Sequence, residues 1–120
     1  MAFRKAGLSV KLDVETDGHN AMATLSNPST GLPACILLDI KLPTISGLEL
    51  LSWIRKQPHL RRVPVIMFTS SLLPGDINKA YDLGANSYLI KPSKLDSLIE
   101  LVRMVDLYWI RTNTPPSNGA

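Results

Sequence analysis

A short apolar stretch that ends in an acid constrains the fold of this chain more than any other feature. Residues 35–43 read Cys-Ile-Leu-Leu-Asp-Ile-Lys-Leu-Pro, so that an unbroken apolar run is followed at once by the carboxylate of Asp39. A run of this kind is typical of a strand that is covered on both faces, as in a parallel sheet. The stretch therefore predicts a buried strand that delivers Asp39 to the edge of a sheet.

Two later apolar runs also end in a polar side chain. Residues 63–68 lead to Thr69, and residues 88–90 lead to Lys91 and Pro92. In an open parallel sheet, functional groups gather outside the carboxyl ends of the strands. The sequence therefore predicts one site that combines the acid of Asp39, the hydroxyl of Thr69 and the ammonium group of Lys91.

The remaining pattern alternates strands and helices. Residues 1–6 are good helix formers followed by a glycine, which predicts the end of a helix, and residues 10–16 alternate apolar and polar side chains as a strand does. Helices are predicted at residues 19–25 and 76–83. A further helix is predicted to begin at the capping pair formed by Ser46 and Glu49. The last helix is predicted from residue 95 along an apolar stripe formed by Leu95, Leu98, Val102, Val105 and Trp109. This order predicts parallel strands joined by right-handed crossovers, a doubly wound α/β sheet.

Composition narrows the class of protein. The 120 residues are 45% hydrophobic, which fits one compact domain. The net charge of +3 is scattered, and no basic stripe indicates a nucleic-acid partner. The single cysteine allows no internal disulfide, and no apolar run approaches the roughly 20 residues of a membrane helix. We therefore expect a cytoplasmic domain that binds neither membrane nor nucleic acid.

Four motifs together resemble the receiver domain of two-component response regulators. They are residues 37–43 with Gly47 eight residues after the acid, residues 67–71, residues 84–88, and the Lys91-Pro92 pair. The resemblance reaches from residue 1 to about residue 109, and it is greatest to stand-alone chemotaxis-type receivers and to those that partner bacterial phytochromes. It implies a flavodoxin-like sheet of order 2-1-3-4-5. We expect a receiver domain over residues 1–111 and a flexible tail over residues 112–120, because the tail is rich in Pro, Ser, Asn and Gly.

The same resemblance implies that a histidine kinase or a histidine phosphotransfer protein hands a phosphoryl group to Asp39. A carboxylate is a competent nucleophile, and the acyl phosphate it forms is labile enough for a reversible signal. Lys91 and Thr69 would then contact the phosphoryl oxygens, with the Lys91–Pro92 bond in the cis form that proline permits. Thr69 and Tyr88 would form the conformational switch that partner proteins read. The protein would act as a switch and not as an enzyme. Whether it forms a homodimer stays open.

Two further positions match residues that tune receivers. Ser71, two residues after Thr69, occupies a position that sets how fast the phosphate is lost, and Lys41, two residues after Asp39, is a second tuning position. Simpler explanations stay open, because Lys41 and Ser71 are also ordinary surface residues and Tyr88 is also an ordinary packing residue.

The family's metal site is only partly matched. Receivers hold Mg²⁺ with an acidic pair at the end of their first strand, and Mg²⁺ prefers oxygen ligands in a near-octahedral arrangement. Here only Asp39 and the main-chain carbonyl of Lys41 match, whereas Asp17 ends a different strand. If the 120 residues are complete, we expect Mg²⁺-dependent phosphorylation to be weak or absent.

The family's first strand also has no counterpart in this sequence. Three explanations are open: the sequence is a fragment or has a misplaced start, a partner chain fills the gap, or the first segment pairs in an unusual way. We favour the first of them on sequence grounds.

Two other functions compete with phosphoryl acceptance. One is a pseudo-receiver that has lost its metal and acts as a protein-binding module. The other is a hydrolase with an aspartate nucleophile. Such hydrolases carry a second acid two residues after the first, where this sequence has Lys41, so the hydrolase is disfavoured.

Overall fold

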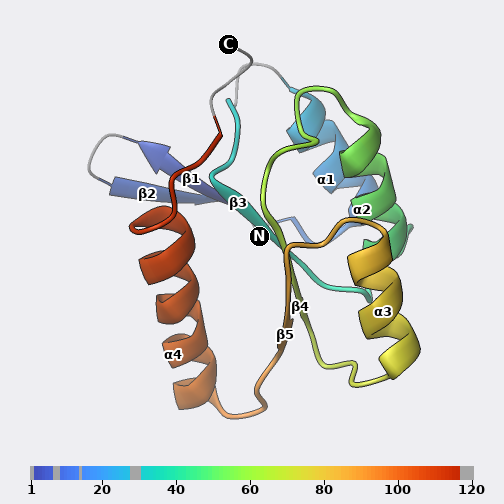
Figure 1. Cartoon of the computed structure of the whole chain (residues 1–120), viewed down its shortest axis with the longest axis vertical. Coiled ribbons are helices and arrows are strands. Elements are labelled where there is room, and N and C mark those ends of the chain that lie inside the picture. Colours follow the sequence, from blue (N-terminus) through green and yellow to red (C-terminus); the bar gives the residue numbers. More distant parts are fainter. Residues whose placement is uncertain (1, 7–8, 14, 28–30, 117–120) are drawn as a thin grey trace.

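A computed structural model describes residues 2–6, 9–13, 15–27 and 31–116 of the chain (Figure 1). Five strands form one sheet: β1 Ala2–Ala6, β2 Ser9–Asp13, β3 Cys35–Leu38, β4 Val65–Thr69 and β5 Ser87–Ile90. The helices are α1 Gly18–Ser26, α2 Gly47–Lys56, α3 Pro74–Asp82 and α4 Leu95–Val105, and a π-helical segment, η2 Asp106–Ile110, continues the last of them.

The half of the sheet that carries the predicted site is parallel. The strand order is β2-β1-β3-β4-β5, and β4 pairs in parallel with both β3 and β5. Helices α2 and α3 connect these strands, which confirms the alternation predicted from the sequence. The carboxyl ends of β3, β4 and β5 therefore meet at one edge of the sheet.

The other half differs from the prediction. Residues Ala2–Ala6 form a strand and not the end of a helix, and this strand is antiparallel both to β2 and to β3, pairing Ala2 with Ile36 and Phe3 with Cys35. The all-parallel sheet expected from the sequence is therefore wrong at this side. The physical reason is that buried backbone groups of β3 require partners, a demand that overrides the weak helix propensity of a short segment.

This pairing corresponds to the third explanation for the unmatched first strand, since the first segment pairs in an unusual way. The strand predicted at residues 10–16 appears as the shorter β2. The glycine expected to end a helix, residue 7, lies outside the described residues.

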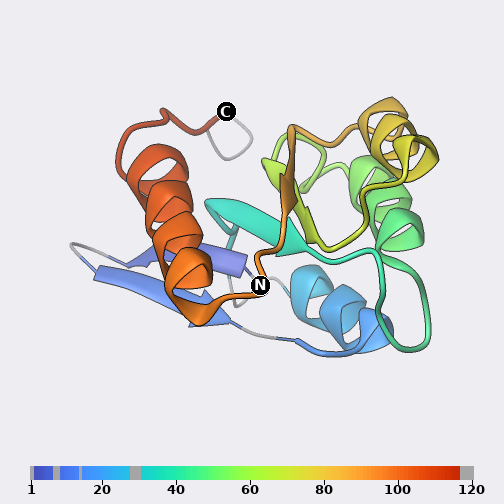
Figure 2. The same ribbon diagram turned by 90° about the horizontal axis from the view of Figure 1, so that it is seen from below.

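Helices cover both faces of the sheet, as a doubly wound fold requires (Figures 1 and 2). Alternate residues of β3 enter two separate cores. Ile36 and Leu38 face α1, α2 and α3, whereas Cys35 and Leu37 face α4 and η2. The buried run of β3 thus packs on both sides, which is why it carries no polar residue before Asp39.

Apart from the helix end expected at residues 1–6, the predicted helices are present with small differences in their bounds. The side chain of Ser46 accepts a hydrogen bond from the Glu49 N–H at 3.1 Å, which confirms this cap of α2. Helix α3 begins at Pro74, two residues before the prediction. In α4, Val105 is buried as expected, but Leu95 is 69% exposed and lies outside the core. Among the described residues, no helix has both the length and the apolar character to span a membrane.

Candidate functional site

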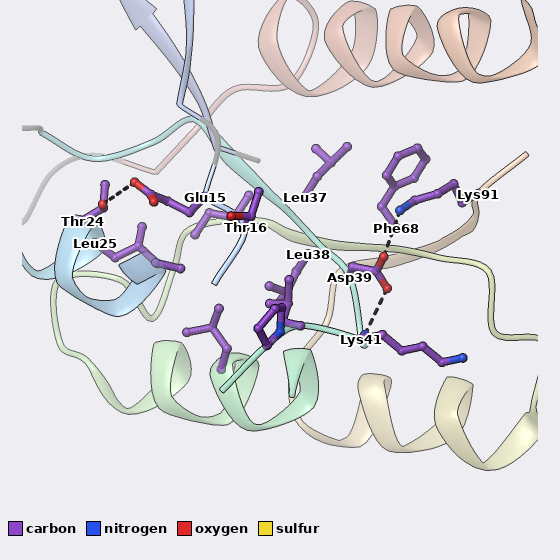
Figure 3. A pocket seen from close by; sticks show the side chains of 15 residues that line it. Glu15, Thr16, Thr24, Leu25, Leu37, Leu38, Asp39, Lys41, Phe68 and Lys91 are labelled. Carbon is purple, nitrogen blue, oxygen red and sulfur yellow. Dashed lines mark hydrogen bonds and ion pairs between the residues drawn. The ribbon is translucent and has the colours of Figure 1, made fainter. Parts of the chain in front are cut away.

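Asp39 and Lys91 meet at the carboxyl edge of the sheet. Asp39 follows β3 directly and Lys91 follows β5, and the Lys91 Nζ atom lies 2.9 Å from Oδ2 of Asp39 (Figure 3). The side chain of Asp39 is 28% exposed and that of Lys91 is 38% exposed, so water screens the ion pair only partly. Lys91 Nζ also lies 5.5 Å from the centre of the Phe68 ring, within the range of a cation–π contact. The structure thus brings together two charges that the sequence separates by 52 positions.

The second carboxylate oxygen of Asp39 is bound by the main chain. The Lys41 N–H donates to Oδ1 at 3.1 Å, while the exposed side chain of Lys41 points away from Asp39 (Figure 3). Each oxygen of the carboxylate therefore accepts a hydrogen bond, one from a backbone amide and one from an ammonium group. Lys41 contacts Asp39 through its backbone and not through its charge.

Thr69 supplies the third predicted group. It ends β4 and is only 1% exposed, and its hydroxyl lies close enough to Asp39 to contribute to the lowered pKa of that carboxyl group. The carbonyl of Thr69 accepts the Lys91 N–H at 2.8 Å, so the two strand ends are joined next to the carboxylate. Asp39, Thr69 and Lys91 therefore form one cluster, as the sequence predicts.

The environment of Asp39 favours its ionised form. Partial burial by itself raises the pKa of the carboxyl group, because it removes water from the charge. The hydrogen bonds from Lys91, from the Lys41 N–H and from Thr69, together with the charge of Lys91, outweigh this effect and hold the pKa below its ordinary value. Asp39 is thus a carboxylate at neutral pH, the form that attacks an electrophile.

The two predicted residues Ser71 and Tyr88 also contact each other. The Tyr88 hydroxyl donates to the Ser71 carbonyl at 3.0 Å, and the Ser71 N–H lies 3.5 Å from Oγ1 of Thr69. The loop after β4 therefore links Thr69 to Tyr88. The Ser71 hydroxyl itself donates to Oδ2 of Asp76 at 2.6 Å.

Asp76 is a residue that sequence reasoning missed. It lies in the first turn of α3, five residues after Ser71. A serine followed by an acid at this distance has no established spacing signal, and only the fold of the loop shows the contact.

Gly47 positions the backbone of Asp39. The Gly47 N–H donates to the Ile40 carbonyl at 2.7 Å, and a β-carbon at residue 47 would overlap the carbonyl oxygen of Asp39. Helix α2 can begin this close to the site only with a glycine as its first residue. This contact explains why a glycine stands eight residues after the acid.

A cavity of about 370 Å³ runs from Asp39 and Lys91 along β3 toward Glu15 (Figure 3). Most of its lining is apolar and includes the side chains of Leu25, Leu38 and Leu42. Glu15 accepts a hydrogen bond from the Thr24 hydroxyl at 2.7 Å at the far end. The polar site therefore occupies one end of a largely apolar cavity.

The described residues do not fit the Mg²⁺ site of a receiver. Asp17 accepts from the His19 and Asn20 N–H groups at 2.8 and 3.1 Å and caps α1, and these bonds, that of Asn20 foremost, lower its pKa. In the ranges that the structure covers, no three His, Cys, Asp or Glu side chains are grouped so that they could hold a metal ion. In the described part of the chain, a hard cation that prefers several carboxylate oxygens finds only the carboxylate of Asp39 beside Thr69 and Lys91.

The Lys91–Pro92 bond is trans, and the cis prediction is wrong; no cis peptide bond occurs among the described residues. For a bond before proline, the trans form is favoured by only about 0.5–1 kcal/mol, so sequence alone does not decide between the two. Lys91 reaches Asp39 with the trans bond in place.

The sequence profile described as "Response regulator receiver domain" matches residues 2–103. The chain belongs to the response regulator receiver family. It is 36% identical over 118 residues to the probable methanogenesis regulatory protein FilR2 of Methanothrix harundinacea, which covers 96% of this chain and 76% of FilR2. It is 35% identical over 111 residues to the response regulator Rcp1 of Synechocystis, which covers 89% of this chain and 76% of Rcp1.

Solved receiver structures share the fold. The Mn²⁺-bound form of Rcp1 matches with a TM-score of 0.82 at 35% identity, over 89% of this chain and 80% of Rcp1. The phosphorylated cyanobacterial phytochrome response regulator RcpA matches with a TM-score of 0.84 at 32% identity, over 94% of this chain and 84% of RcpA. These matches confirm the predicted flavodoxin-like fold. Receiver domains are two-component signalling modules, phosphorylated by histidine kinases, and the family includes members that bind divalent metal.

Proposed function

We propose that this receiver domain accepts a phosphoryl group on Asp39 from a histidine kinase or a histidine phosphotransfer protein. The observation that supports the proposal most is the 2.9 Å ion pair between Asp39 and Lys91, next to the buried hydroxyl of Thr69. An Asp39 oxygen forms a bond to phosphorus while the bond between phosphorus and the donor histidine nitrogen breaks, and the electron pair of that bond returns to the imidazole.

Each neighbour of Asp39 has a task in this reaction. Lys91 leaves the carboxylate and binds a phosphoryl oxygen, which balances the charge of roughly −1.5 to −2 that a phosphoryl group carries at neutral pH. Thr69 donates its hydroxyl hydrogen bond to a second phosphoryl oxygen. The Lys41 N–H stays on the carboxyl group and orients it, and Lys41 thereby tunes the reaction through its backbone.

The signal leaves the site through the loop after β4. When Thr69 turns to the phosphoryl group, the segment from Thr69 to Ser71 shifts, and the Tyr88 hydroxyl loses its acceptor at the Ser71 carbonyl. Tyr88 then changes rotamer, and the altered surface is what a partner protein reads. We place the receiver unit at residues 1–111 and a tail at residues 112–120, and the protein acts as a switch and not as an enzyme.

Intact mass spectrometry tests the acceptor. The chain is incubated with acetyl phosphate at a high Mg²⁺ concentration, and separately with a phosphorylated histidine kinase domain. A fraction of the wild-type molecules is expected to gain the mass of one phosphoryl group, a fraction limited by the incomplete metal site. Asp82→Asn, which removes an exposed acid on α3, is expected to match wild type, whereas Asp39→Asn gains none. A gain that survives in Asp39→Asn overturns the assignment. No gain in wild type favours a binding module that has kept the receiver surface without its chemistry.

A further inference from the structure

The hydroxyl of Ser71 is held by a carboxylate on the neighbouring helix. Its Oγ donates to Oδ2 of Asp76 at 2.6 Å and lies 3.4 Å from the N–H of Leu73. A hydroxyl-to-carboxylate bond of this length belongs to the strong, charge-assisted class. Because a serine hydroxyl has a single proton, the proton given to Asp76 is not offered to any other acceptor.

The residue that holds Ser71 is itself well anchored. Asp76 lies in the first turn of α3, where the helix dipole favours a negative charge, and its N–H donates to the Leu73 carbonyl at 3.0 Å. The loop between Ser71 and Asp76 is therefore closed on itself by two hydrogen bonds. In the unphosphorylated protein, Tyr88 adds a third restraint at the Ser71 carbonyl. Once phosphorylation breaks that bond, the bond to Asp76 is the one that holds the Ser71 hydroxyl.

We propose that Asp76 is a positioning residue that keeps the Ser71 hydroxyl turned toward α3 and thereby slows hydrolysis of the phosphoryl group on Asp39. The inference rests on the proposed function. In that hydrolysis a water oxygen bonds to phosphorus and the bond from phosphorus to the Asp39 oxygen breaks. Its electron pair returns to the carboxylate, and inorganic phosphate and a proton leave to the solvent. A released Ser71 hydroxyl, two residues from Thr69, orients the attacking water; the hydroxyl bound to Asp76 does not.

The lifetime of the acyl phosphate tests this arrangement. Wild type, Asp76→Ala, Ser71→Ala and the double variant are phosphorylated, freed from the donor, and followed by intact mass. Asp76→Ala is expected to shorten the lifetime by about fivefold, within the range that one charge-assisted hydrogen bond allows. The double variant is expected to match Ser71→Ala, because Asp76 acts only through that hydroxyl. Asp82→Ala, on the same helix, is the control and is expected to leave the lifetime unchanged.

Two outcomes overturn the inference. One is an unchanged lifetime in Asp76→Ala. The other is an equal shortening in the presence and absence of the Ser71 hydroxyl, which indicates a general loss of structure. Asp76→Asn keeps an acceptor oxygen and is expected to lie nearer to wild type.

A second measurement needs no phosphorylation and separates this inference from the proposed function. Amide hydrogen exchange at Ser71 and Leu73 in the unmodified protein is expected to be faster in Asp76→Ala than in wild type. Unchanged exchange overturns the positioning role even if Asp39 is phosphorylated. A wild-type protein that accepts no phosphoryl group overturns the proposed function, and the role in hydrolysis with it, whatever the exchange shows.

Discussion

Gly47 packs directly against the carbonyl group of Asp39. A β-carbon added at residue 47 would overlap the Asp39 carbonyl oxygen and would lie 2.7 Å from its carbonyl carbon and 2.9 Å from the Cα atom of Ile40. All three are backbone atoms, which cannot turn aside as a side chain does. The first residue of α2 thus fixes where the acid of the site lies.

This contact predicts a large effect of Gly47→Ala. The added methyl group forces β3 and α2 apart, so we expect the free energy of unfolding to fall by about 1–3 kcal/mol and the yield of phosphorylated Asp39 to fall with it. Gly75→Ala is the matched control, since nothing lies within 4 Å of a β-carbon at this position in α3. The control is expected to stabilise the helix by roughly 0.5–1 kcal/mol. Urea unfolding compares the two, and equal effects would contradict the contact.

The lowered pKa of Asp39 predicts how stability depends on pH. A carboxyl group whose pKa is lower in the folded state stabilises the fold above its unfolded pKa of about 3.9, and the contribution disappears as the pH falls through the folded value. The difference in unfolding free energy between wild type and Asp39→Asn is therefore expected to change between pH 7 and pH 3, with wild type losing stability toward acid.

Lys91→Met provides the control for this pH dependence. It removes the partner that holds the carboxylate, so wild type is expected to lose more stability toward acid than this variant does. Urea unfolding at several pH values measures both. The same pH profile in wild type and Lys91→Met would show that the ion pair is not the cause.

The sequence predicted the cluster of Asp39, Thr69 and Lys91 because each of these residues ends or directly follows an apolar run. Asp39, Thr69 and Lys91 need only the rule that parallel strands end at one edge, and the structure follows that rule in β3, β4 and β5. The strand at residues 2–6 was predicted as a helix end. Its conformation is set by the backbone groups of β3, which need hydrogen-bond partners, and not by local helix propensity. Asp76 was missed for a related reason, because its contact with Ser71 depends on the path of a loop.

Arg55 joins α2 to the loops that precede β4 and β5. Its guanidinium group donates to the carbonyls of Gly84 at 2.9 Å and Val63 at 2.8 Å, and to Oδ1 of Asn86 at 2.8 Å. Burial lowers the pKa of this group, and no carboxylate among its described partners compensates for the lost water. Hydrogen bonds from the rigid guanidinium group must therefore stabilise this half-buried charge.

Arg55→Lys is therefore expected to be destabilising. Lysine has one nitrogen and cannot reach these separate acceptors together, so we expect the free energy of unfolding to fall by about 2 kcal/mol. The exposed Arg62→Lys is the control and is expected to have little effect. Chemical denaturation measures both variants, and a fully stable Arg55→Lys protein would argue against the network.

Cys35 is predicted to be chemically inert in the folded protein. It is completely buried in β3, and this burial raises the pKa of its thiol to about 12. The thiolate is the nucleophile that attacks a disulfide reagent, and with this pKa the thiolate is nearly absent at pH 8. Labelling with a chromogenic disulfide is therefore expected only after unfolding in urea. Rapid labelling of the native protein would show that the core on this face of the sheet opens.

The small number of carboxylates at the site predicts weak metal binding by this polypeptide. Mg²⁺ and Mn²⁺ prefer several oxygen ligands, and of the described residues only Asp39 brings a carboxylate to the edge, already engaged with Lys91. Rcp1 has been solved in a Mn²⁺-bound form and provides the reference. In a titration that follows free Mn²⁺ by electron paramagnetic resonance, we expect this chain to bind Mn²⁺ at least about tenfold more weakly than Rcp1 does.

Two variants test whether Asp39 holds the metal. Asp39→Asn is expected to abolish the remaining binding, and Asp82→Asn to leave it unchanged. An affinity equal to that of Rcp1 would show that ligands other than Asp39 complete the site.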